Sequence, residues 1–293
     1  MPDLQKQTVQ WFPGHMAKTR RQIKESLPLV DCVTELLDAR VPLASRNPEL
    51  DALTGHKPRI VLLNKRDMAD DETTRRWIEW FRTKGQSALA VDCRSGKGLN
   101  QYHTLVRRVL ADRIKANEAR GMAGKALRVM VVGIPNTGKS SFINRMAGKN
   151  RAKVADRPGV TRQNQWFAIG NGIELLDTPG VLWPKFDDPA VGDKLAFIGS
   201  VKDEVTDSET MACRLIAVLQ AQHIPLLCER YKLAEADVAG EEPYTVLERI
   251  GLRRGMKIRG GDVDTERAAV TLLDEYRAGK LGKLSIETPE LDG

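Results

Sequence analysis

The chain has 293 residues, 41% of them hydrophobic and 29% charged, as in a globular protein of one or two domains with a buried core. The net charge of +7 suits a nucleic acid or another phosphate-rich partner, although a basic protein that binds only a nucleotide would also fit. The sequence has no cysteine pair with zinc spacing, no signal-peptide core and no apolar run near the ~20 residues that span a bilayer, so we expect reduced thiols, a cytoplasmic location and no membrane partner.

The N-terminal part of the chain alternates between predicted helices and strands. A basic segment comes first, in which Trp11–Met16 contains a Pro-Gly turn and Ala17 to about Leu27 is a predicted helix that ends at Pro28. The elements that follow are predicted strands at 30–40, 59–63 and 88–91 and predicted helices at about 70–84 and 99–119.

The sequence from residue 127 onward predicts a second half of the sheet and then a helical region. A strand at 127–132 precedes a glycine-containing loop and a helix, and a hairpin over 165–176 follows. Beyond about residue 200, helical patterns dominate, at 208–222, 226–234, 245–250 and 265–278. We therefore predict an α/β domain over 1–204, with a mostly parallel sheet covered by helices on both faces, and a small all-α domain over 205–293.

The loop Gly133–Ser141 matches the pattern GxxxxGK[ST] between a strand and a helix, which is typical of a phosphate-binding loop. Glycines let the backbone approach a phosphate chain, and backbone N–H groups at the helix N-terminus face its negative charge. Lys139 can reach the terminal phosphates and Ser140 can ligate Mg²⁺. The expected nucleotide contacts in this loop are Asn136, Thr137, Gly138, Lys139, Ser140 and Ser141.

The sequence Asp177–Gly180 ends a strand after the phosphate loop. A DxxG match alone is usually a turn, but this position suits an aspartate in the Mg²⁺ shell and a backbone N–H of Gly180 that meets the terminal phosphate. Asp177 and Ser140 are therefore predicted magnesium ligands.

The sequence Asn64-Lys65-Arg66-Asp67 is a candidate for base recognition. A carboxylate such as Asp67 can accept two hydrogen bonds from guanine, whereas adenine has no such donor pair. Asn64 can bond the purine edge and Lys65 can lie along the ring. An exposed polar turn after a strand is the simpler interpretation of these residues alone, and the phosphate loop favours the guanine site.

The loop Asp92–Gly98 is a weaker candidate for the base side of the site, where backbone N–H groups around Arg94 and Ser95 could meet the guanine carbonyl. In most GTPases the phosphate loop precedes the base-reading motif, whereas here Asn64–Asp67 comes first. The same sheet can form from a circularly permuted chain, because its packing does not depend on where the termini fall.

These motifs together resemble the circularly permuted ribosome-biogenesis GTPases of the YlqF/RbgA family. The matching segments are Trp11–Met16, Asp38–Arg40, Asn64–Asp67, Gly133–Ser141, Pro158–Thr161, Asp177–Gly180 and Tyr276–Lys283. The resemblance implies GTP hydrolysis to GDP, slow alone and stimulated by the particle, coupled to assembly of the large ribosomal subunit. It also implies a C-terminal helical domain that contacts rRNA, and we expect a monomer.

The resemblance also implies roles for three further residues. Thr161 matches the switch threonine, a second Mg²⁺ ligand in the GTP state, although it could be an ordinary loop threonine. Val181 and Leu182 occupy the positions where many GTPases carry a water-orienting glutamine. The resemblance points to His15 as the substitute, but His15 could instead fix the Pro-Gly turn or touch RNA. Asn136 could hold K⁺, or only shape the loop.

Three functional hypotheses stay open at this point. The first is a GTPase that binds the precursor of the large subunit with GTP and leaves after hydrolysis. The second is an RNA-binding assembly factor in which GTP is mainly a structural or switch ligand, and the third is a permuted GTPase acting on another RNA or a membrane partner. RNA contact is favoured by a glycine-broken basic stretch in the helical region, with Arg249, Arg253, Arg254, Lys257 and Arg259.

Overall fold

The computed structural model describes residues 16–148, 165–180, 188–201 and 207–290. Backbone contacts group them into two compact units, each described here by itself. The sheet unit comprises residues 16–66, 71–148, 165–180 and 287–290, and the helical unit comprises residues 67–70, 188–201 and 207–286.

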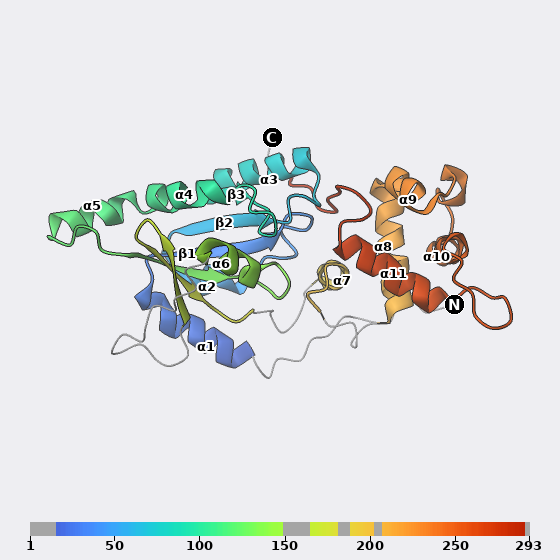
Figure 1. Cartoon of the computed structure of the whole chain (residues 1–293), viewed down its shortest axis with the longest axis horizontal. Helices are drawn as coiled ribbons and strands as arrows, with labels where there is room; N and C mark the ends of the chain where they lie inside the picture. The colour runs from blue at the N-terminus through green and yellow to red at the C-terminus, as the bar shows by residue number, and fades with distance from the viewer. Residues whose placement is uncertain (1–15, 149–164, 181–187, 202–206, 291–293) are drawn as a thin grey trace. The chain divides into compact units, whose positions relative to one another are not determined.

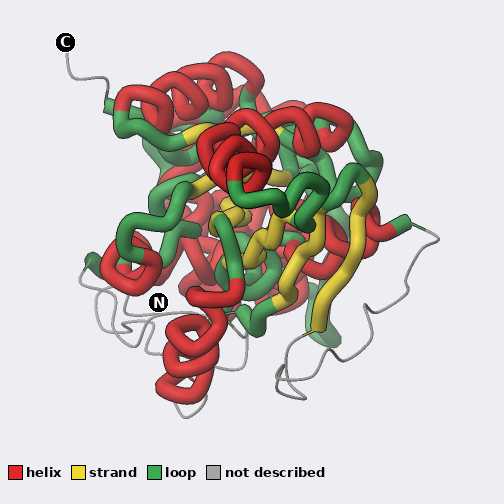
Figure 2. Tube along the Cα trace, turned by 90° about the vertical axis from the view of Figure 1, so that its left-hand side faces the viewer, coloured by secondary structure: helices red, strands yellow, loops and turns green. Residues whose placement is uncertain are grey.

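The described part of the sheet unit contains one sheet in which the strands run in the order β3-β2-β1-β4-β6-β5. All neighbouring pairs are parallel except the β5–β6 pair, which is antiparallel. The strands are β1 (Cys32–Asp38), β2 (Arg59–Asn64), β3 (Ser87–Ala90), β4 (Leu127–Val132), β5 (Gln165–Gly170) and β6 (Ile173–Asp177). Helices lie on either side of this twisted sheet (Figure 2), so the predicted α/β class is confirmed.

Alternation along the strands divides the sheet's apolar residues between two cores, because successive side chains point to opposite faces. On β4, Val129 and Val131 enter one core, while Met130 and Val132 enter the other. The first core also holds side chains of α4 (Tyr102–Val109) and α6 (Lys139–Ala147), and the second holds side chains of α1 (Met16–Ser26) and α2 (Glu49–Thr54). A sheet with both faces buried explains why its central strands read as continuous apolar runs.

Some elements differ from the sequence prediction. The helix expected over 99–119 is divided into a short 3₁₀ turn (Leu99–Gln101), α4 and α5 (Ala111–Ala119), because Leu110 leaves helical geometry, with φ −102° and ψ 19°, where it packs into the core. The helix α3 (Asp71–Thr83) matches its prediction. Two short helices, α2 and α7 (Pro189–Phe197), were not predicted.

The helical unit contains α7, α8 (Ser208–Gln222), α9 (Ile224–Tyr231), α10 (Pro243–Arg253) and α11 (Thr265–Arg277), of which α8–α11 gather together in Figure 1. Aspartates begin three of these helices: Asp188, Asp207 and Asp264 each accept a backbone N–H of the first turn. Among the described residues no single helix is long and apolar enough to cross a membrane, whereas α8 and α9, bent by 118°, meet that criterion only as a pair.

The C-terminal residues 287–290 pack within the sheet unit. The buried carboxylate of Glu287 accepts the backbone N–H of Leu43 at 2.8 Å and that of Ala44 at 3.2 Å, in the loop after β1. The Trp77 indole of α3 donates to the Glu287 carbonyl oxygen at 3.1 Å. Through these bonds, residues near the C-terminus fix the loop that follows β1.

Replacing Glu287 by Ala should lower the free energy of unfolding by about 1–3 kcal/mol, because two backbone N–H groups, one of them that of the buried Ala44, lose their charged acceptor. Urea denaturation measures the change, with Glu290→Ala as the control, since Glu290 is exposed nearby. Equal destabilisation by both substitutions would contradict a specific role for the Glu287 carboxylate.

Candidate nucleotide-binding site

The predicted phosphate loop connects β4 to α6 in a conformation that depends on glycine. A Cβ atom on Gly133 would lie 2.7 Å from the backbone oxygen of Leu36, and Gly138 is left-handed with φ 99°. Asn136 is also left-handed, with φ 64°, and it is exposed. The buried Thr137 hydroxyl donates to the Ile134 carbonyl at 2.9 Å. The loop is therefore folded back on itself within the described structure.

Lys139, the first residue of α6, spans this loop. Its Nζ atom donates to the carbonyl oxygen of Gly133 at 3.1 Å. Burial lowers the pKa of Lys139 to about 8, although the charge of Asp177 opposes this change. Burial also raises the pKa of Asp177, which Lys139 opposes. The two charged groups are thus close enough to act on one another's pKa, and an ammonium group and a carboxylate are the groups that a phosphate and a divalent cation would bind.

The loop after β6 lies against the phosphate loop. The Thr178 hydroxyl donates to the Val131 carbonyl of β4 at 2.6 Å. A Cβ atom on Gly180 would lie 2.9 Å from Lys139 Nζ and 3.1 Å from the backbone nitrogen of Pro135. A side chain here would crowd Lys139 and Pro135, so glycine lets the backbone at residue 180 lie close to the Lys139 ammonium group.

Asn64, the last residue of β2, joins three loops. Its buried side-chain amide donates from Nδ2 to the Thr137 carbonyl at 2.7 Å, and its Oδ1 accepts the backbone N–H of Cys93 at 3.0 Å. The amide thus ties the loops after β2 and β3 to the phosphate loop, and its contact with the purine edge stays a prediction. Sequence spacing alone does not reveal the contacts with Thr137 and Cys93.

The motif Asp38-Ala39-Arg40 orients Lys65. Asp38 Oδ2 lies 2.9 Å from Lys65 Nζ and 2.8 Å from an Arg40 guanidinium nitrogen. Burial alone would raise the pKa of Asp38, but Arg40 and Lys65 hold it well below its usual value. The backbone of Lys65 is left-handed, with φ 60°, and the buried Asp38 carboxylate holds its ammonium group. The aliphatic part of the Lys65 side chain is therefore fixed beside the loop where a base would lie.

The loop after β3 is shaped by Asp92. Its Oδ1 accepts the backbone N–H groups of Arg94 at 2.8 Å and Ser95 at 3.2 Å. Burial acts to raise the pKa of Asp92, but its hydrogen bonds with Ser95 and Arg94 lower it overall. Both N–H groups predicted to meet guanine thus bond Asp92 in this structure, and contact of this loop with the base stays a prediction.

The other predicted site residues are placed as follows. Ser140 and Ser141 are exposed in the first turn of α6, and Arg66 and Asp67 are half-buried. Contacts assign Arg66 to the sheet unit and Asp67 to the helical unit. His15 and Thr161 lie outside the described residues.

Two of the three predicted magnesium ligands, Ser140 and Asp177, lie within the described residues, and their chemistry fits this ion. The Ser140 hydroxyl and the Asp177 carboxylate are the hard oxygen ligands that Mg²⁺ prefers. Asp177 ends β6, and its register partner on the neighbouring strand is Val131, one residue before the end of β4. The strand register thus brings Asp177 beside the start of the phosphate loop, where a metal shared with phosphate would lie.

The phosphate loop, the Asp177 loop, the Asn64 loop and the Asp92 loop all follow parallel strands at the same edge of one sheet. This fold and loop set define a P-loop nucleotide-binding protein of the GTPase class, with its motifs in permuted order. A family profile described as "50S ribosome-binding GTPase" matches residues 128–246.

Comparison with known proteins defines the family. The chain is 45% identical to "Ribosome biogenesis GTPase A" of Bacillus cereus, over 96% of this chain and 94% of that one, and 33% identical to the Thermotoga maritima protein of that name, with the same coverage. The solved structure of GNP-bound YlqF from T. maritima has a TM-score of 0.64 at 29% identity, covering 93% of this chain and 99% of that chain. The chain belongs to the ribosome biogenesis GTPase A (RbgA/YlqF) family.

Gly138→Ala should abolish tight nucleotide binding, because the added Cβ would lie 2.3 Å from Asn64 Nδ2 and displace the amide that joins the loops. We expect the Kd of a fluorescent GDP analogue to rise on the order of 100-fold or more, the equivalent of losing a few hydrogen bonds. Gly148→Ala is the matched control, since Gly148 also has positive φ but open space around it. Similar losses in both variants would attribute the effect to backbone strain instead.

The lowered pKa of Lys139 predicts a pH-dependent affinity. A bound phosphate favours the ammonium form and raises its pKa, so binding takes up a proton above pH 8 and affinity falls as pH rises. We expect the Kd for GDP to increase about tenfold between pH 7 and pH 9. In Lys139→Arg the guanidinium stays charged, so this part of the pH dependence should vanish. Identical pH profiles for the two proteins would exclude Lys139 as the titrating group.

Proposed function

We propose that the protein is a GTP-hydrolysing assembly factor that binds the precursor of the large ribosomal subunit with GTP and is released after hydrolysis. The observation that carries this proposal is the Asn64 amide, which ties a guanine-type base loop to a phosphate loop in one site. Relatives named "Ribosome biogenesis GTPase A" and "Mitochondrial ribosome-associated GTPase 1" support the ribosomal partner. We place its action in the cytoplasm, as a monomer.

In this proposal each loop has one task. Asp67 accepts two hydrogen bonds from guanine, and Lys65, held by Asp38, covers the ring. Lys139 and the backbone of residues 136–141 bind the phosphates. Mg²⁺, held by Ser140, Asp177 and, in the GTP state, Thr161, would neutralise charge that develops on the phosphates during transfer.

We assign the role of orienting the attacking water to His15. Val181 and Leu182 carry no hydrogen-bonding side chain, so in this proposal His15 supplies the group. A neutral imidazole near pH 7 has the required acceptor nitrogen. The exposed, left-handed Asn136 in the phosphate loop stays the candidate ligand for K⁺, whose charge would act on the phosphates.

The helical unit is proposed to contact rRNA through the basic stretch that includes the end of α10 and the segment after it. Ion pairs within the unit make two of these cations weaker candidates. Arg254 pairs with Glu275 at 3.0 Å and Arg249 pairs with Glu241 at 3.3 Å, within the helical unit. The exposed cations Arg253, Lys257 and Arg259 are the better candidates for phosphate contacts.

GTP turnover measured with and without purified large subunits tests the proposal. We expect slow turnover alone, stimulation by the particle, and a stimulated rate in His15→Ala reduced on the order of 100-fold, as for loss of a general base. The particle is added at constant salt, because phosphate contacts weaken steeply with salt.

Two outcomes would change the proposal. Absence of stimulation, with GTP-dependent particle binding retained, would favour the alternative in which GTP is a structural or switch ligand. A stimulated rate that is unchanged in His15→Ala would remove His15 from the mechanism and leave Asn136-bound K⁺ or the particle as the source of the catalytic group.

A further inference from the structure

The loop Asp92–Gly98, on the predicted base side of the site, is contacted by Arg145 of α6, the helix that begins at Lys139. The Arg145 guanidinium donates to the carbonyl oxygen of Ser95. It also lies over Gly96, where an added Cβ atom would be 2.7 Å from Arg145 Nε and 2.9 Å from a terminal guanidinium nitrogen. Gly96 is left-handed, with φ 90°, so glycine suits both this backbone conformation and the close approach of Arg145.

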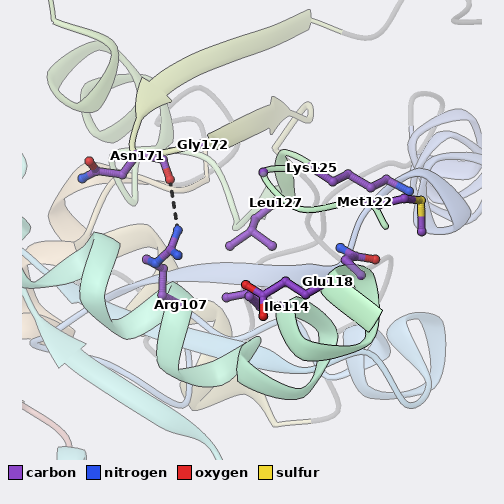
Figure 3. Close-up of a pocket in the computed structure, with 10 residues that line it drawn as sticks. Arg107, Ile114, Glu118, Met122, Lys125, Leu127, Asn171 and Gly172 are labelled. Atoms are coloured by element: carbon purple, nitrogen blue, oxygen red, sulfur yellow. Dashed lines mark hydrogen bonds between the residues drawn. The ribbon is translucent and has the colours of Figure 1, made fainter. Parts of the chain in front are cut away.

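Other contacts fix the two ends of this loop. At its start, the Cys93 N–H is held by the Asn64 amide at 3.0 Å. At its end, the chain leads into α4, and Arg107 of α4 donates to the Asn171 carbonyl in the β5–β6 turn at 3.4 Å (Figure 3). The contact with Arg145 holds the middle of the loop between these two points.

Hydrogen bonds within the loop close residues 92–96 into one turn. The Asp92 carboxylate accepts the N–H groups of Arg94 and Ser95, and the Asp92 carbonyl oxygen accepts the Gly96 N–H at 2.7 Å. A turn closed by its own hydrogen bonds keeps its shape when it is displaced. A contact at the Ser95 carbonyl therefore also sets the position of the two N–H groups that are predicted to meet guanine.

We propose that Arg145 is a positioning residue for guanine recognition, which holds the N–H groups of Arg94 and Ser95 beside the 6-oxo group of the base. The oxo group would share these N–H groups with the Asp92 carboxylate. This inference rests on the proposed function, because it requires a guanine nucleotide in the site. Arg145 lies in the last turn of α6, a helix of nine residues whose first turn carries Lys139. One short helix thus links the phosphate end of the nucleotide site to its base end.

The test compares two nucleotides that differ at one atom. In 6-thioguanosine diphosphate a sulfur, which is a weak hydrogen-bond acceptor, replaces the 6-oxo atom of GDP, while the phosphates and the N–H groups offered to Asp67 are unchanged. We expect Arg145→Ala, in the full chain with Mg²⁺, to raise the Kd of GDP on the order of fivefold and that of the thio analogue less than about twofold, as for the loss of one hydrogen bond. Isothermal titration calorimetry measures both constants. Asn144→Ala, at the exposed neighbour on α6, should bind both nucleotides as the parent does.

A second set of variants tests the same contact from the side of the loop. Gly96→Ala should displace the Arg145 guanidinium and reduce the preference for GDP over the thio analogue, as Arg145→Ala does. The double variant should lose little beyond either single variant, because one contact can be broken only once. Gly85→Ala is the control for an alanine at positive φ, since the space around Gly85 is open.

The outcomes separate this inference from the proposed function. If Arg145→Ala raises both dissociation constants equally, Arg145 acts on the phosphates or on the stability of α6, and the inference alone is overturned. Full additivity in the double variant would overturn it as well. A parent protein that binds both nucleotides equally well would exclude the loop's contact with the 6-oxo group, and with it the inference. A parent that binds neither nucleotide would refute the proposed function itself.

Discussion

The nucleotide site depends on a single side-chain amide, that of Asn64. In the sheet, β1 lies between β2 and β4, so the loops after β2 and β4 are not joined by strand hydrogen bonds. Asn64 crosses this gap to Thr137 and also reaches Cys93 after β3. Because the amide is buried, loss of either partner would leave a polar group without a hydrogen bond, and the three loops therefore keep one arrangement.

The end of β1 fills the space that Asn64 crosses. Gly133 packs against the Leu36 carbonyl, the Ala39 N–H donates to the Asn64 carbonyl at 2.8 Å, and Asp38 draws the Lys65 ammonium toward the strand. A buried carboxylate needs an opposite charge beside it, and Arg40 and Lys65 both supply one to Asp38. The ion pair with Asp38 thus fixes the side chain of Lys65, whose backbone is left-handed.

The sequence was sufficient to predict the strands and most of the helices, and the edge of the sheet where the candidate site lies, but it was less informative about short helices and about contacts between distant residues. The apolar runs of β1, β2 and β4 and the glycine pattern of Gly133–Ser141 are local signals, and the structure confirms the fold class they predicted. The break at Leu110, the short helix α2 and the return of Glu287 to the loop after β1 depend on tertiary packing. The same holds for Asn64, whose partners lie 73 and 29 residues away.

The permuted order changes which parts of the chain are covalently joined, even though the sheet is the same. Within the recognition motif, Arg66 belongs to the sheet unit and Asp67 begins a segment of the helical unit. In that segment the Met68 carbonyl accepts the Leu284 N–H at 3.0 Å, and Met68 packs where a Cβ on Gly279 would collide at 2.6 Å. Because Met68 follows Asp67 directly, these contacts join the end of the predicted base-recognition motif to the segment after α11. In a chain that began at the phosphate loop, the base-recognition motif would come near the end of the sequence. The residues that follow it would then not be joined in this way to the segment after α11.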